Sequence, residues 1–191
     1  MKRTLYSLNP EEYPNIKIDF IETTAKGARN FSNGEIIKAK KTAIVQAERL
    51  KEDTVVDTRV RTIIDGKTYV FDETKNIAPA GAIVITNPDG EQYVIKDKQK
   101  DDVVITALEQ FESKYTRTEN GFLSTEGARN FLKLNEHVTF TASWGEQMFA
   151  PAGSMLCIEY GEGEEYSVTN SAFASTYKKI ELAKEIDPPA M

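Results

Sequence analysis

Two arginine–asparagine pairs are the residues of this chain whose types and spacing best suit ligand recognition. Arg29 and Asn30 belong to the segment Gly-Ala-Arg-Asn-Phe, and an identical segment later in the chain contains Arg129 and Asn130. A guanidinium presents a planar fork of donors to carboxylate or phosphate, and a carboxamide both donates and accepts hydrogen bonds. Backbone N–H groups of an open turn before each pair could add to such a site. We therefore predict that these four residues bind a small anion.

A structural role for the same two segments is the alternative interpretation. The glycines would then fix turns, and each arginine would pair with a nearby carboxylate. Phe31 and Phe131, which end the two segments, would fill the hydrophobic core. The sequence leaves the choice between ligand binding and packing open.

Trp144 is the candidate for contact with a partner protein, because it precedes Gly145 in a predicted turn and a turn tip is often exposed. A packed turn cap is the alternative. His137 is the only histidine, so any Ser-His-Asp or Cys-His triad would depend on it. Cys157 lies among apolar residues and reads as a buried thiol. The sequence predicts no catalytic residues, no cofactor and no metal ligand, and it gives little reason to expect an enzyme.

Four tyrosines recur in register between the two halves of the chain. Stacking on a base or another ring is one possible use of such residues. Their positions on predicted strand and helix faces favour core packing instead. They are Tyr93, Tyr115, Tyr166 and Tyr177.

The composition is typical of a globular protein rather than a disordered one. The chain has 191 residues, of which 40% are hydrophobic and 28% charged. No apolar run approaches the roughly 20 residues of a membrane helix, and we expect no signal peptide. The net charge of −6 argues against general nucleic-acid binding. With a single cysteine, no intramolecular disulfide can form, and a reducing cytoplasm is the expected compartment.

Strand patterns dominate the elements that must position these residues. Residues 60–64 and 67–71 flank Asp65-Gly66, which supplies the positive φ values of a two-residue hairpin turn. Residues 82–86 and 91–96 flank a second turn signal, Asn-Pro-Asp-Gly. Residues 43–47 fit a strand or a helix, and the parallel with the second half favours a strand. Two helices are predicted, one from Asp101 or Asp102 to about Tyr115 and one that Asn170 or Ser171 caps and Asp187-Pro-Pro stops.

Three anchors recur in the same order and predict a tandem repeat. We expect an α+β fold of two tandem small β-rich units, each with antiparallel hairpins followed by one helix. A pseudo-twofold axis or a simple translation would relate the units. The anchors are residues 27–31 and 127–131, Pro-Ala-Gly at 79–81 and 151–153, and Phe-x-x-x-Tyr at 111–115 and 173–177. The predicted divisions are a lead-in segment with one strand (1–23), unit one (24–118), unit two (119–186) and a tail (187–191).

Shorter motifs follow one another in a constant order within both units. The first contains Val-Gln-Ala at 45–47, Gly-Glu-Gln-Tyr at 90–93 and Phe-Glu-Ser-Lys-Tyr at 111–115. The second contains Gly-Glu-Glu-Tyr at 163–166 and Phe-Ala-Ser-Thr-Tyr at 173–177. This order resembles a small family of phage and prophage proteins recognised by a Pro-Gly-Asp-Tyr-Gly or Pro-Gly-Asp-Tyr-Leu motif.

The chain departs from that family at the motif itself. In place of Pro-Gly-Asp-Tyr it has Pro-Ala-Gly-Ala at 79–82 and Pro-Ala-Gly-Ser at 151–154. Any function of the family's aspartate and tyrosine is therefore not inherited. The resemblance covers residues 43–116 and 138–178, and it implies a phage-like origin and a fold rather than a mechanism.

We expect a phage-type accessory protein that acts by binding a host protein or a small anionic ligand, with no catalysis of its own. The duplicated Arg-Asn segments and the lack of catalytic motifs motivate this expectation. One alternative is a virion or assembly component that forms homo-oligomers through edge strands. Another is an enzyme of nucleotides or nucleic acid that uses Arg29 or Arg129 for phosphate. The expected location is the host cytoplasm, with virion association as the alternative and no membrane contact.

Overall fold

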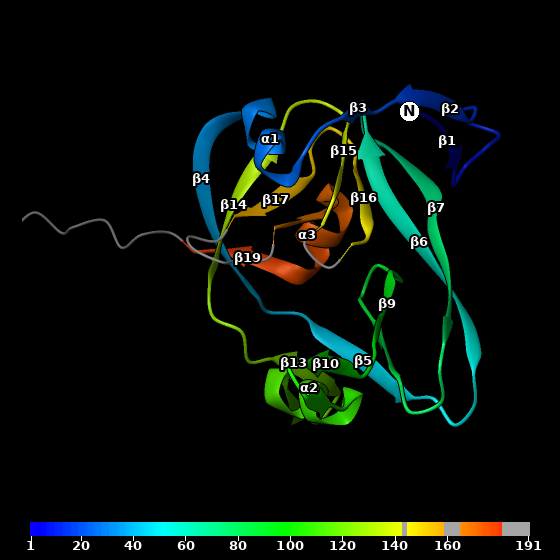
Figure 1. The fold of residues 1–191 in the computed structure, drawn as a ribbon. Coiled ribbons are helices and arrows are strands. Elements are labelled where there is room, and N and C mark those ends of the chain that lie inside the picture. Colours follow the sequence, from blue (N-terminus) through cyan, green and yellow to red (C-terminus); the bar gives the residue numbers. More distant parts are fainter. Residues whose placement is uncertain (143–144, 159–164, 181–191) are drawn as a thin grey trace, which may run out of the picture.

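The computed structural model describes residues 1–142, 145–158 and 165–180, except for the side chains of residues 73–76 (Figure 1). It is 55% strand and 13% helix. The predicted α+β class, with a helix closing each hairpin unit, is therefore wrong, and the protein is β-rich. Among the described residues, no helix combines the length and apolar character needed to cross a membrane. The helical segments are α1 (Ala25–Ala28), η1 (Arg29–Phe31), α2 (Ala107–Lys114) and α3 (Asn170–Thr176).

The helices are short because neighbouring β-branched and aromatic residues continue as strands. The helix predicted from Asp101 or Asp102 begins only at Ala107, where the Thr106 side chain accepts a hydrogen bond from the Glu109 N–H. Upstream of it, β10 (Lys98–Lys100) and β11 (Val103–Ile105) pair as a separate two-stranded sheet. A helix of eight residues or fewer covers only part of a sheet.

Two five-stranded sheets form the body of the molecule, and their strand orders match. The orders are β12-β13-β5-β8-β9 and β19-β4-β14-β17-β18. The first contains β5 (Ile44–Arg49), β8 (Ile83–Thr86), β9 (Gln92–Ile95), β12 (Tyr115–Thr118) and β13 (Gly121–Ser124). The second contains β4 (Ser32–Lys41), β14 (Arg129–Leu134), β17 (Met155–Ile158), β18 (Tyr166–Val168) and β19 (Tyr177–Lys179). The strand predicted over residues 43–47 is confirmed by β5.

Each half of the chain contributes one strand to the sheet of the other half. β4 leads into β5 but pairs with β14, and β13 leads into β14 but pairs with β5. The register stays nearly constant along this crossing, from Ile37 opposite Phe131 to Val45 opposite Phe122. The four strands therefore form one antiparallel ribbon that passes through both sheets (Figure 1). Because the exchange of strands is reciprocal, a pseudo-twofold relates the two halves, and this is one of the two relations that the repeat allowed.

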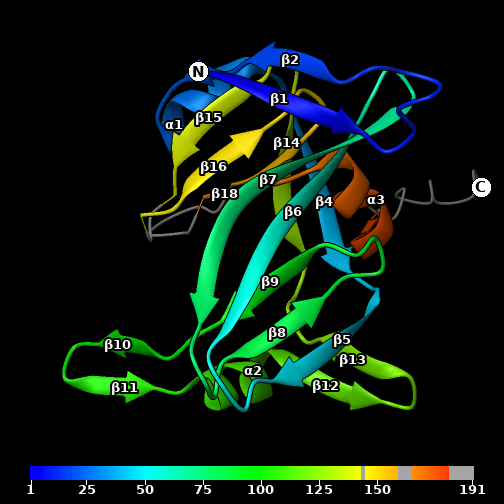
Figure 2. The ribbon, with the colours of Figure 1, turned by 90° about the vertical axis from the view of Figure 1, so that its right-hand side faces the viewer.

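A long hairpin runs along the side of the molecule, from the N-terminal strands to the region of α2 (Figure 2). Its turn is the predicted one, with φ of 52° at Asp65 and 76° at Gly66. It joins β6 (Thr54–Ile64) and β7 (Lys67–Ala78), which belong to the sheet β2-β1-β7-β6 with β1 (Lys2–Ser7) and β2 (Ile16–Asp19). The corresponding elements of the second half are β15 (Val138–Thr141) and β16 (Gln147–Ala150), which pair with each other. On its other side β15 pairs with β3 (Ile21–Glu22).

Asn170, at the start of α3, links the long hairpin to the second sheet by hydrogen bonds to β6. Its side chain accepts a hydrogen bond from the Ile63 N–H at 2.9 Å and donates one to the Ile63 carbonyl at 2.7 Å. The carboxamide thus mimics a strand partner for one residue of β6.

The two Phe-x-x-x-Tyr segments have the same geometry in both halves. Phe111 stacks on Tyr115 with centroids 5.1 Å apart, and Phe173 stacks on Tyr177 at 5.1 Å. Each pair packs into the apolar core between its helix and its sheet.

The two Gly-Ala-Arg-Asn-Phe segments, in contrast, are not structurally equivalent. Gly27 and Ala28 lie in α1, and Arg29–Phe31 form η1 ahead of β4. Arg129–Phe131 instead form the start of β14, whose counterpart in the first half is β5. Treating the two segments as matching anchors of the repeat is therefore wrong.

Candidate functional site

Arg29 and Arg129, predicted to bind an anion, each form an ion pair with a carboxylate of the chain. The Arg29 guanidinium pairs with Glu165, whose side chain is only 10% exposed. Arg129 Nη2 lies 3.3 Å from Glu126 Oε1. These contacts fit the structural alternative, in which each arginine pairs with a nearby carboxylate. An anion would have to compete with that carboxylate at either position.

The two asparagines lie in different environments and are not brought to one site. Asn30 is exposed in η1. Asn130 is half-buried in the middle of the second sheet, opposite Lys38 on one side and Ile158 on the other. Trp144, the predicted partner contact, lies outside the described residues.

A polar cluster occupies the crossing of the ribbon, where the two halves meet. Glu126 lies between two cations, with its carboxylate 3.9 Å from Lys41 Nζ and 3.3 Å from the Arg129 guanidinium. Lys41 Nζ is also 5.9 Å from the ring centroid of Tyr93 and 5.9 Å from that of Tyr177, one ring from each half. Burial lowers the pKa of Lys41, and the Glu126 carboxylate opposes part of this effect.

The four recurrent tyrosines pair through their phenol groups around this cluster. Tyr93 pairs with Tyr115 in the first half, and the Tyr166 and Tyr177 oxygens lie 3.5 Å apart in the second. Burial is the largest cause of a raised pKa at all four phenols. The prediction that these tyrosines pack in the core is confirmed for their rings, which pack against both apolar cores.

These phenols make stability depend on alkaline pH. In the unfolded chain a tyrosine loses its proton near pH 10, whereas the folded protein holds it to higher pH, so the unfolded state is favoured as pH rises above 10. We expect the free energy of unfolding to fall between pH 9 and pH 11 by about 2–3 kcal/mol less in the double variant Tyr166→Phe, Tyr177→Phe than in the parent, since each phenol accounts for about 1.4 kcal/mol. Urea unfolding at the two pH values measures this difference. Tyr6→Phe, at an exposed position, is the control, and an equal pH dependence in all three proteins would contradict the assignment.

His137 and Cys157 have structural environments. The His137 Nδ1 atom accepts a hydrogen bond from the Ala152 N–H at 2.9 Å, and its ring lies 5.9 Å from that of Phe20. Burial lowers the pKa of His137. Cys157 is completely buried, which confirms that part of its prediction.

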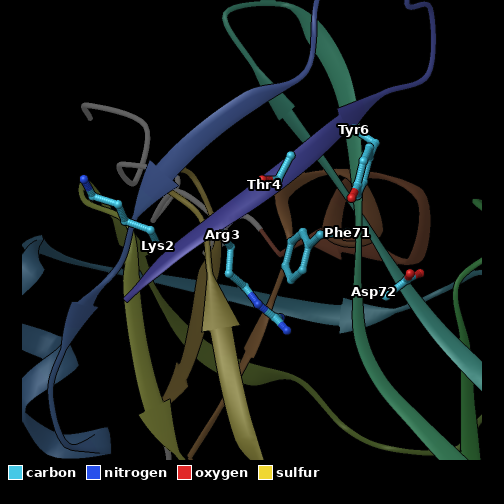
Figure 3. Close-up of a pocket in the computed structure, with 6 residues that line it drawn as sticks. All are labelled: Lys2, Arg3, Thr4, Tyr6, Phe71 and Asp72. Atoms are coloured by element: carbon cyan, nitrogen blue, oxygen red, sulfur yellow. The ribbon is translucent and has the colours of Figure 1, made fainter.

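A pocket of about 350 Å³ opens between β1 and β7, and Arg3 forms part of its lining (Figure 3). The Arg3 and Phe71 side chains lie next to each other between the two strands, while Lys2 extends away from them. Asp72, at the pocket wall, is 3.4 Å from Arg59 Nε and so already has a cationic partner. The remaining lining residues are Thr4 and Tyr6.

Arg3 is held by aromatic contacts rather than by a carboxylate. Its Cζ atom lies 4.0 Å from the centroid of Phe149 and 5.8 Å from that of Phe71. Its Nη1 atom is buried and has no hydrogen-bond acceptor among the described residues. A buried donor without an acceptor is uncommon and costs about 1–3 kcal/mol. This guanidinium is therefore preorganised for an acceptor that the described part of the chain does not supply.

Sequence reasoning missed Arg3 because it treated the N-terminus as a lead-in. The residues from Lys2 to Ser7 form β1 and carry a usable signal, since Leu5 and Ser7 are buried on the same face as Arg3. An arginine on the inward face of a strand is the feature that could have pointed to it.

Comparisons with known proteins find no relative: no family model, no curated protein and no solved structure matches the chain.

Proposed function

We propose that this is a phage-type accessory protein that acts by binding, without catalysis, and that its ligand presents an anionic group to Arg3. The phage-type part rests on the motif order resembling that of the phage family. The observation that carries the binding site is the buried Arg3 Nη1 donor at a surface pocket, for which the described residues offer no acceptor. Carboxylate and phosphate are the acceptors that a guanidinium fork recognises best.

The surroundings of Arg3 favour an anion over a neutral acceptor. Phe71 and Phe149 remove water from one side of the guanidinium, which strengthens an ionic hydrogen bond formed on the other. Lys2, exposed at the same pocket, adds positive charge to a protein with a net charge of −6. The acidic side chain among the lining residues, Asp72, is bound to Arg59.

The experiment is a titration of isotope-labelled protein with acetate, inorganic phosphate and a nucleoside monophosphate, followed by NMR. Arg3→Met keeps the length and apolar packing of the side chain but removes the charge and donors. We expect at least one anion to bind the parent protein at the β1–β7 pocket and to bind Arg3→Met about tenfold more weakly, because an ionic hydrogen bond contributes about 1.5–3 kcal/mol.

Lys17→Met is the matched control, since it removes the same charge from an exposed position on neighbouring β2. Binding that is equally weakened in both variants would reflect net charge alone. Binding unaffected by Arg3→Met, with the variant folded by circular dichroism, would refute the site.

A further inference from the structure

Over most of the length of β7, no described strand pairs with its outer edge. β1 pairs with β7 at only two positions, Tyr6 with Val70 and Ser7 with Tyr69. From there β1 follows β2, with which it pairs as far as Lys2 opposite Asp19. β7 continues to Ala78, paired with β6 on its other side. Among the described strands, none pairs with the edge of β7 beyond Phe71.

A β-bulge marks the point where this edge becomes free. Thr58 of β6 lies opposite Thr74, but the next residue, Arg59, lies opposite Asp72, so Glu73 is an extra residue in β7. Bulges bend a strand and increase its twist, and they are common next to binding sites. Asp72 also lines the Arg3 pocket, so the pocket lies at one end of the open edge.

An exposed apolar pair lies near the other end of the edge. Val55 and Ile77 are opposite each other on β6 and β7 and are 62% and 67% exposed. At roughly 3.3 Å per residue, the distance from Asp72 to Ile77 is about 17 Å, which an extended segment of six or seven residues covers.

We propose that the natural ligand is an extended segment of a partner polypeptide, which adds as a strand to the free edge of β7 and places a carboxylate on Arg3. This inference rests on the proposed function and specifies its ligand. Strand addition satisfies the backbone groups at this edge of β7, and an apolar side chain of the segment packs on Ile77, the neighbour of Val55. The carboxylate accepts a hydrogen bond from the buried donor of Arg3. The carboxylate belongs either to an acidic side chain or to the C-terminus of the partner.

The test uses three forms of one acetylated peptide, Lys-Val-Thr-Val-Thr-Val-Thr: the free acid, the C-terminal amide, and an amide extended by glutamate. We expect the free acid, the glutamate form or both to slow hydrogen exchange at the edge of β7 between Asp72 and Ala78. We expect each bound form to bind about tenfold more tightly than the plain amide. Arg3→Met should remove that difference. Ile77→Lys should weaken every form, and Lys17→Met should leave all of them unchanged.

Tighter binding of the free acid alone would assign the carboxylate to a C-terminus, and tighter binding of the glutamate form alone would assign it to a side chain. Anion binding at Arg3 without protection of β7 by any peptide would overturn strand addition and leave the proposed function standing. Protection of β7 by acid and amide with equal affinity would overturn the role of Arg3 in strand addition, while the anion titration with Arg3→Met decides the proposed function separately. Self-association of the protein that Ile77→Lys abolishes would make a second copy the occupant and would favour the assembly role.

Discussion

Phe131→Ala is expected to lower the free energy of unfolding by about 4 kcal/mol, because truncating a fully buried phenylalanine removes its apolar area and leaves a cavity. The Phe131 ring is 0% exposed. It meets the rings of Phe173 and Tyr177 edge-on at centroid distances of 5.3 and 5.1 Å. Denaturation by urea, followed by circular dichroism, measures the change.

Phe31→Ala is the matched control, because Phe31 ends the identical five-residue segment. Its side chain is only partly buried, in η1 at the margin of another apolar cluster. We expect a loss of about 1–2 kcal/mol there, since partial burial removes less area from water. Equal losses for the two variants would contradict the conclusion that the two segments have different structural roles.

Glu126→Gln is expected to destabilise the protein by about 3 kcal/mol, at the lower end of the range for breaking a buried ion pair. The amide has nearly the same shape as the carboxylate but removes the negative charge that Glu126 places beside Lys41 and Arg129. Their side chains are 21% and 28% exposed, so water screens part of the repulsion. Urea unfolding at pH 7 measures the loss.

A second substitution separates charge from packing at this cluster. Lys41→Met in the Glu126→Gln background removes one of the two cations that lose the Glu126 carboxylate and should restore about half of the lost stability. By itself, Lys41→Met should cost little, because burial already lowers the pKa of Lys41 and so disfavours its charged form. A double variant no more stable than Glu126→Gln alone would show that geometry, not charge, dominates.

Local sequence signals predicted the hairpins well, because a turn depends on a few adjacent residues. Asp65-Gly66 specified the long hairpin, and the turn before Gly90, with φ of 88°, joined β8 and β9 as expected. The helix before Tyr115 was predicted too long, since Val104 fits its apolar face by spacing, yet Val104 and its neighbour Val103 lie in β11. Their β-branched side chains favour the strand that they form.

The exchange of strands between the sheets could not be read from local pattern. The side chains of β4 would alternate in the same way whether it joined the sheet of β5 or paired, as it does, with β14. Only the long-range register decides which strand becomes its partner. The identical Gly-Ala-Arg-Asn-Phe segments led to a wrong alignment of the two halves for a related reason. An identical segment can end in a 3₁₀ turn or begin a strand, because tertiary contacts determine its conformation.

The sequence predicted the chemical group of the candidate site, a guanidinium, but not the residue that supplies it. A guanidinium was the expected anion receptor, yet Arg29 and Arg129 have carboxylate partners within the fold. Whether an arginine has such a partner depends on residues distant in sequence: Glu165 is far from Arg29 along the chain. Arg3 became a candidate only because β1 separates from β7, a divergence that no single segment encodes.

The ribbon of β4–β5 and β13–β14 makes the two halves of the chain dependent on each other. A break in the loop at Glu119 and Asn120, between β12 and β13, would leave each fragment holding a strand of the other's sheet. A protein with one such half would have to complete its sheet by dimerising, at a yield set by concentration. When the halves are joined in one chain, the same association becomes intramolecular, with an effective concentration in the millimolar range. Assembly of the sheets is then independent of the protein concentration.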